Sequence, residues 1–129
     1  DAAVLVVDTE TRHLPAAEAY AVIAKLTRDA MSAGVFSIYK KTDSALRGNI
    51  GAELSALLKT SGERRLPFLP AFPQIDRVTR DGVHYISGVP VTESPFGIDL
   101  RAGAPRQGDG AHRGADRCAC LQLSDPERG

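Results

Sequence analysis

Short apolar runs alternate along this chain with segments of helical periodicity, and this alternation constrains the fold more than any other feature. Residues 2–7, 35–41 and 66–72 are short and apolar, which is typical of buried strands. Between them, residues 15–34 and 50–62 carry apolar residues at helical spacing, and each segment ends at a glycine. Strands that alternate with helices predict an α/β fold with three layers, in which helices flank a mostly parallel sheet with right-handed crossovers.

The second half of the chain changes character. Residues 82–91, GVHYISGVPV, predict a β-hairpin that turns at Ser87-Gly88. After residue 97 the chain is rich in glycine and arginine, and its short apolar cluster CACLQL buries too little surface to offset the entropy of ordering the segment. We therefore predict a partial domain over residues 1–97 and an irregular, poorly ordered tail over residues 98–129.

Charge and composition exclude several classes of partner. Lys+Arg and Asp+Glu both number 16, so the formal net charge is zero, and no electrostatic argument favours a nucleic acid or an acidic membrane. No apolar run approaches the roughly 20 residues that span a bilayer, and the start DAAVLVVDTE lacks the basic region of a signal peptide. Cys118 and Cys120 are too close for an ordinary disulfide, and no metal-ligand set is predicted. These features predict a reduced, cytoplasmic chain and leave its oligomeric state open.

A polar junction lies between the second predicted strand and the second predicted helix. Residues 39–54, YKKTDSALRGNIGAEL, hold lysines, an aspartate, an arginine, two glycines and an asparagine. In open α/β sheets, ligands bind where strands lead into helices. Asn49 is a suitable N-cap, and a helix that begins at Ile50 offers unpaired N–H groups and the positive end of its dipole.

The side chains of this junction suit a small anion that carries hydroxyl groups. Arg47 presents a planar fork that matches a carboxylate, and we expect it to be the main carboxylate anchor. Asp43 and Ser44 can bind hydroxyl groups, while Gly48 and Gly51 allow close approach to the backbone. A sugar acid fits better than a nucleotide, because the junction has neither a phosphate-loop pattern nor an aromatic platform. A polar loop that only caps the helix is the alternative that the residues leave open.

Three motifs resemble one known family. They are YKKTDSALRGNIGAELSALL, LPFLPAFPQIDRVTR and DGVHYISGVPVTESPF, preceded by VLVVDTETR. Together they resemble the amino-terminal domain of the four-carbon acid sugar kinases over about residues 2–96. In that family, the amino-terminal α/β domain binds a sugar acid such as threonate, erythronate or 3-oxo-tetronate. A carboxyl-terminal domain binds ATP with Mg, and the substrate's terminal hydroxyl is phosphorylated.

The resemblance implies a set of substrate-binding residues. From the first motif it implies that the sugar-acid site is lined by Lys41, Asp43, Ser44, Arg47, Gly48 and Asn49. The early segment adds Arg12, and the second and third motifs add Arg77 and His84. A strand histidine such as His84 is more often a half-buried pairing residue than a ligand. No catalytic residue is assigned, and neither ATP nor Mg is expected to bind this chain.

The chain departs from the family pattern at several places. Ala45 stands where threonine is usual, Asp76 where glycine precedes the arginine, and Val78 where the first threonine of R-T-T is usual. The opening D-D-x-T-G-A motif and the ATP domain have no counterpart, and the residues after Phe96 match no family segment. We interpret the tail as the product of a frame change in a GC-rich gene.

Three functions remain compatible with these observations. The chain is a fragment of a sugar-acid kinase with residual binding at most, a non-catalytic module that binds a small hydroxy acid or docks on a full-length kinase, or a non-functional product of a damaged gene. The small-molecule partner expected for this chain is a sugar acid.

Overall fold

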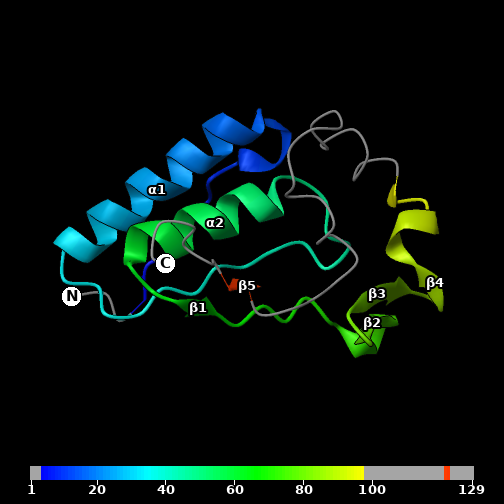
Figure 1. The fold of residues 1–129 in the computed structure, drawn as a ribbon. Helices are drawn as coiled ribbons and strands as arrows, with labels where there is room; N and C mark the ends of the chain where they lie inside the picture. Colours follow the sequence, from blue (N-terminus) through cyan, green and yellow to red (C-terminus); the bar gives the residue numbers. More distant parts are fainter. Residues whose placement is uncertain (1–3, 98–120, 123–129) are drawn as a thin grey trace, which may run out of the picture.

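Two α-helices dominate the structure, a computed structural model that describes residues 4–97 and 121–122. Helix α1 spans Ala16–Ser32 and helix α2 spans Ile50–Ser61, within the two segments whose periodicity predicted them. The helices run in the same direction, and the extended chain after α1 returns along them before α2 begins (Figure 1). Among the described residues, no helix is both long enough and apolar enough to cross a membrane.

The core lies between the two helices. Small and branched side chains form it and allow the helices to approach closely: Ile23, Ala24, Ala56 and Leu57. The partly buried side chains of Tyr20 and Leu66 pack against this cluster. Helix α2 is the more deeply buried of the pair, because Leu54 and Leu58 on it are also almost fully covered. It ends where Gly62 takes a left-handed conformation with φ 74°, as expected for a glycine that stops a helix.

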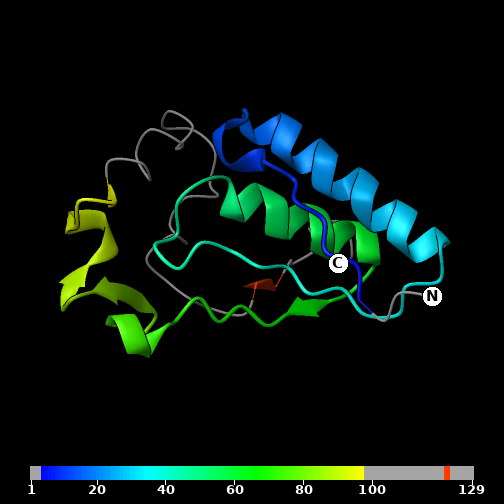
Figure 2. The ribbon, with the colours of Figure 1, turned by 180° about the vertical axis from the view of Figure 1, so that it is seen from behind.

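A small antiparallel sheet forms at one end of the molecule (Figure 2). Its strands are β2 (Arg77–Arg80), β3 (Val83–Ile86) and β4 (Val89–Pro90), in the order β2-β3-β4. The predicted turn at Ser87-Gly88 is confirmed, and it connects β3 to β4. A second tight turn at residues 81–82 connects β2 to β3, so the predicted hairpin is one half of a three-stranded meander. Both turns have positive φ at their two central residues, the geometry that Asp-Gly and Ser-Gly pairs accommodate.

The predicted parallel sheet is wrong for the described residues. The chain over 4–9 and 35–42 is extended but forms no strand (Figure 1). Its apolar side chains face solvent, as shown by Val6 at 87% exposure and Phe36 at 101%. The three-layer architecture is therefore not observed, and the described fold is a mixed α/β arrangement of two helices and an antiparallel meander.

The parallel sheet does not form among the described residues because one face of the extended segments is not covered by a helix. A parallel sheet is stable when helices shield both of its faces. In the described structure, α1 and α2 pack on each other, and no described element lies over the other side of the extended segments. The prediction of buried strands over these apolar runs is therefore wrong for the described residues, because composition alone does not show whether neighbouring strands are present to pair with them.

The third predicted strand, 66–72, is mostly irregular. Only β1 (Arg65–Leu66) forms there, and it pairs antiparallel with β5 (Leu121–Gln122). The prolines at 67 and 70 lack the N–H that a ladder needs, which explains why the strand stops. Of the predicted tail, the structure describes only β5. Residues 98–120 and 123–129 lie outside the described part, and the boundary at residue 97 stays a prediction.

Candidate functional site

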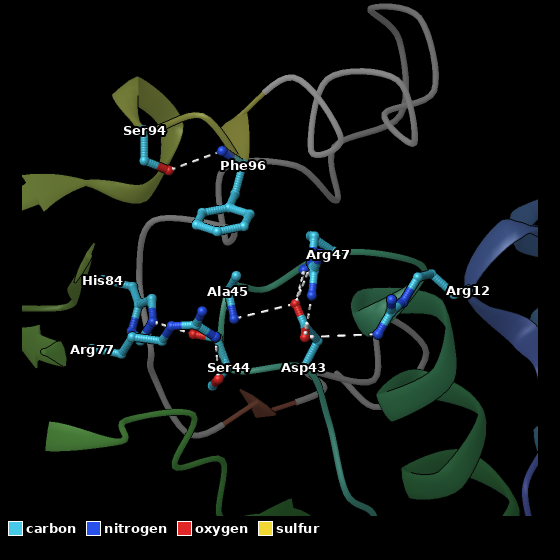
Figure 3. A network of polar contacts seen from close by, with 9 residues as sticks. All are labelled: Arg12, Asp43, Ser44, Ala45, Arg47, Arg77, His84, Ser94 and Phe96. Atoms are coloured by element: carbon cyan, nitrogen blue, oxygen red, sulfur yellow. Dashed lines mark hydrogen bonds and ion pairs between the residues drawn. The ribbon is translucent and has the colours of Figure 1, made fainter. Parts of the chain in front are cut away.

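The polar junction forms a loop between the helix pair and the meander. Figure 3 shows its side chains between Arg12 on one side and Arg77 and His84 on the other. The loop reverses direction through two left-handed residues, Leu46 with φ 59° and Gly48 with φ 88°. It then enters α2 directly, with Asn49 at the N-cap position of that helix.

Asp43 is the centre of the loop's hydrogen bonds. Its Oδ2 accepts the backbone N–H groups of Ala45 and Arg47, both at 3.2 Å. The Arg47 guanidinium donates from Nε to Oδ2 at 2.8 Å and from Nη2 to Oδ1 at 3.0 Å. The hydrogen bond from the Arg47 side chain is the main reason that the pKa of Asp43 falls to about 2, although burial acts in the opposite direction. Asp43 is therefore an ionised group that holds the loop in shape.

The meander holds the other side of the loop through Ser44. Arg77 donates from Nη1 to the Ser44 hydroxyl at 2.5 Å. His84 Nε2 lies 2.8 Å from the Ser44 carbonyl oxygen, and its Nδ1 lies 3.0 Å from the Thr79 hydroxyl. Because a carbonyl only accepts, Nε2 donates to it, and in a neutral imidazole Nδ1 then accepts from the Thr79 hydroxyl. His84 is 0% exposed, so its place in the site is that of a support beneath Ser44.

The 3-10 turn η1 (Thr11–His13) lies against the end of the loop. Asn49 Nδ2 donates to the Thr11 carbonyl at 2.9 Å and to the Leu14 carbonyl at 2.8 Å. Asn49 occupies the N-cap position of α2 but makes no side-chain capping bond there. Its amide therefore connects η1 to α2, which differs from the capping role that the sequence predicted. Gly48 is equally constrained, since an added Cβ would lie 3.1 Å from the Arg12 Cγ.

A buried ion pair next to the loop was not predicted from the sequence. Lys40 Nζ lies 2.5 Å from Glu53 Oε2, and the two side chains are only 18% and 8% exposed. Thr11 donates to the other carboxylate oxygen of Glu53 at 2.6 Å. Lys41, which the family resemblance placed in the site, is exposed and forms no hydrogen bond or ion pair with a described residue. Side chains alternate along an extended segment, so only one of Lys40 and Lys41 can point inward. No local signal in the sequence identifies which of the two does so.

Phe96 completes the group and was not among the predicted site residues. The Arg47 Cζ lies 5.3 Å from the centroid of its ring, and the Arg77 Cζ lies 5.4 Å from it. Figure 3 shows the ring beside Arg47 and above Ala45. The only sequence signal was its position at the end of the third motif.

The structure thus brings together most of the residues that the sequence predicted for the site. They are Arg12, Asp43, Ser44, Arg47, Gly48, Asn49, Arg77 and His84. Two guanidinium groups, those of Arg12 and Arg47, meet the Asp43 carboxylate, and that of Arg77 meets the adjacent Ser44 hydroxyl, so the local charge is positive and suited to an anion. Among residues 4–97, no cluster of three His, Cys, Asp or Glu side chains could hold a metal ion.

Several known proteins resemble this chain in sequence. A family model described as "Sugar-binding N-terminal domain" matches residues 1–106. The chain is 42% identical over 99 residues to a D-threonate kinase of Bordetella bronchiseptica, covering 76% of this chain and 24% of that protein. It is 39% identical over 97 residues to a D-threonate kinase of Salmonella typhimurium, covering 74% and 23%. A D-erythronate kinase of Heliobacterium modesticaldum is 31% identical over 99 residues, covering 74% and 22%.

A solved structure agrees with these similarities. The crystal structure of a domain of unknown function from Bordetella bronchiseptica, a domain-swapped dimer with bound citrate, superposes with a TM-score of 0.65 at 40% identity. The match covers 73% of this chain and 24% of that one. The chain therefore spans about a quarter of the length of the relatives that it matches.

Proposed function

Because this chain belongs to the four-carbon acid sugar kinase family, as its sugar-binding amino-terminal domain, we propose that it binds a four-carbon sugar acid of the threonate or erythronate class. The loop 43–49 and its neighbours form the binding site, and the anionic carboxylate of the ligand is recognised by guanidinium groups. The observation that carries this proposal is that Arg12 and Arg47 meet the carboxylate of Asp43 while Arg77 meets the hydroxyl of the adjacent Ser44, so three guanidinium groups lie along one short loop.

The three arginines have different roles in this proposal. The Nε and Nη2 groups of Arg47 both face Asp43, so its fork is directed at a protein carboxylate. The Arg12 side chain is 49% exposed, and its one described polar contact is with Asp43 at 3.7 Å, beyond hydrogen-bonding distance. Arg12 is therefore the donor that a ligand carboxylate meets first, while Arg47 adds positive charge and keeps Asp43 in place.

Phosphorylation of the bound acid is the activity we propose for a complete kinase that contains this domain. ATP, bound with Mg²⁺, supplies the phosphoryl group in that reaction, and positioning and charge stabilisation at the phosphates supply most of the catalysis. The described residues contain no phosphate-loop pattern and no carboxylate cluster for a metal. We therefore assign ATP binding to the part of a complete kinase that this chain does not span. We assign recognition of the sugar acid to this chain.

Calorimetric titration tests the proposal directly. D-threonate and D-erythronate are titrated into the full 129-residue chain and into Arg12→Ala and Arg12→Lys. A charge-assisted hydrogen bond contributes about 1.5–3 kcal/mol, so Arg12→Ala lowers affinity by about one to two orders of magnitude. Arg12→Lys loses less, because it keeps the charge without the fork. Arg64→Ala, an exposed arginine just after α2, is the control that leaves binding unchanged. A folded wild type that binds neither acid would overturn the proposal.

A further inference from the structure

The ring of Phe96 contacts two arginines of the site at once. The Arg47 and Arg77 Cζ atoms lie at nearly equal distances from its centroid, 5.3 and 5.4 Å. Arg47 comes from the loop that enters α2, and Arg77 begins strand β2. The ring is thus a shared contact between two elements that meet at the site.

The backbone that carries Phe96 is held in place by its own turn. Ser94 is buried, and its hydroxyl donates to the Val91 carbonyl at 2.7 Å while it accepts from the Phe96 N–H at 3.3 Å. Gly97 donates to the Ser94 carbonyl at 2.9 Å. Only a glycine fits at position 97, because an added Cβ would lie 2.3 Å from the Thr92 carbonyl oxygen. The ring therefore projects from a closed turn that follows η3 (Val91–Glu93).

Two guanidinium groups of like charge need a reason to stay together. Asp43 neutralises Arg47 through two hydrogen bonds, whereas the described polar contact of Arg77 is with the neutral hydroxyl of Ser44. The face of an aromatic ring carries negative potential and attracts a guanidinium within about 6 Å. The ring thus supplies an attraction that Ser44 cannot supply, and it does so for both arginines.

We propose that Phe96 is a positioning residue for the sugar-acid site: its aromatic ring, rather than its bulk, holds the guanidinium groups of Arg47 and Arg77 at the loop, where their positive charge favours an anionic ligand. This inference rests on the proposed function for the identity of the ligand. It adds the third motif's terminal phenylalanine to the site, although that side chain has no group able to form a hydrogen bond with a sugar acid.

Two substitutions separate the effect of the aromatic ring of Phe96 from the effect of its apolar bulk. Phe96→Leu keeps an apolar side chain but removes the π face, and Phe96→Tyr keeps both. Pro95→Ala changes an exposed neighbour and serves as the control. In the full chain, the arginine side-chain protons of Arg47 and Arg77 are assigned by NMR in the absence of ligand, together with the relaxation of each Nε. D-threonate affinity is then measured by calorimetry for all four proteins.

The expected results distinguish the two proposals. The arginine protons are shifted upfield by the ring in the wild type and in Phe96→Tyr, and in Phe96→Leu they lose this shift while both Nε groups become more mobile. Two cation–π contacts at the strength of exposed sites correspond to about a 5- to 30-fold loss of D-threonate affinity in Phe96→Leu, with Phe96→Tyr within about twofold of the wild type. Unchanged arginine spectra in Phe96→Leu, or equal affinities in Phe96→Leu and the wild type, would overturn the role of Phe96. If the wild type binds no acid, the proposed function fails, and the arginine spectra alone decide whether the ring holds the two groups.

Discussion

Asp43 shows how far the site could be derived from residue types. The sequence placed a carboxylate, a hydroxyl and an arginine in one loop, because these residues are close along the chain. It could not show that the Asp43 carboxylate already receives four hydrogen bonds, two of them from the Arg47 side chain. That arrangement depends on the left-handed conformations of Leu46 and Gly48, which fold the loop back on itself. The local pattern therefore predicts the members of the site, whereas the pairing among them depends on backbone geometry.

The ionisation of Asp43 makes the stability of the fold sensitive to acid. Its pKa is lowered from 3.8 to about 2, mainly by the hydrogen bond from the Arg47 side chain. A depressed pKa stabilises the fold above the pKa of the unfolded chain, and that contribution is lost as the pH falls from about 3.8 towards 2. We expect the free energy of unfolding of the wild type to fall more steeply over this interval than that of Asp43→Asn, as measured by urea titration.

The control for this measurement is Asp29→Asn. Asp29 is an exposed carboxylate that pairs with Lys25 on the surface of α1, so its removal leaves the loop unchanged. The Asp29→Asn protein should follow the steep pH dependence of the wild type. Equal slopes for Asp43→Asn and the wild type would show that the Asp43 carboxylate does not hold the loop.

The helices and the strands differ in how well the sequence predicted them. Helical periodicity is a local property, and the sides of α1 and α2 that carry Ile23 and Leu57 do form the core. A strand needs a hydrogen-bonding neighbour that lies far away along the chain, so an apolar run alone cannot show whether a ladder forms. The meander was predictable in part, because Ser87-Gly88 is a turn signal, and the Asp-Gly pair at 81–82 is an equally clear one that the hairpin prediction did not use.

The connection between η1 and α2 predicts an unusual effect at Asn49. An asparagine that acted as an N-cap would be replaced by aspartate at little cost, because both are favoured caps. Here the Asn49 amide donates to the Thr11 and Leu14 carbonyls, and a carboxylate would face the same two oxygens without a proton to donate. We expect Asn49→Asp to lower the free energy of unfolding by about 1–3 kcal/mol at pH 7, measured by urea denaturation.

A second variant makes the cause specific. Ser61→Ala removes another part-buried side-chain donor, because the Ser61 hydroxyl donates to the Leu58 carbonyl at the far end of α2. This bond lies within the last turn of one helix, so its loss should lower the free energy of unfolding by less than Asn49→Asp does. An Asn49→Asp protein as stable as the wild type would instead support the capping role.

The molecule as a whole exposes apolar surface that most single domains bury. Leu5 is 81% exposed and Tyr39 is 90% exposed, and both belong to extended segments without a ladder. Contiguous exposed apolar residues on unpaired extended chain promote association between copies. The match covers about a quarter of the length of the relatives. In those proteins, other parts of the chain, outside the matched region, are therefore available to cover this surface.

This surface predicts concentration-dependent self-association of the chain. Leu5→Thr combined with Phe36→Thr keeps residues that favour extended structure but removes two large apolar side chains from solvent. We expect sedimentation equilibrium to give a higher average mass for the wild type than for the double variant at the same concentration. Val89→Thr, at a 41% exposed position on β4, should behave as the wild type. Identical masses for the wild type and the double variant would exclude these segments as the cause.

The hydrogen bonds that hold the loop 43–49 form in a particular order while the chain is being synthesised. The contact between α1 and α2 needs only residues up to about Ser61, so the two helices can pack before the rest of the chain has left the ribosome. The bonds that fix Ser44 come from partners 33 and 40 residues later in the sequence, whereas those of Asn49 come from residues already made. The loop is therefore completed after the helix pair, and a nascent chain that ends before Arg77 has both helices but lacks the two bonds that hold Ser44.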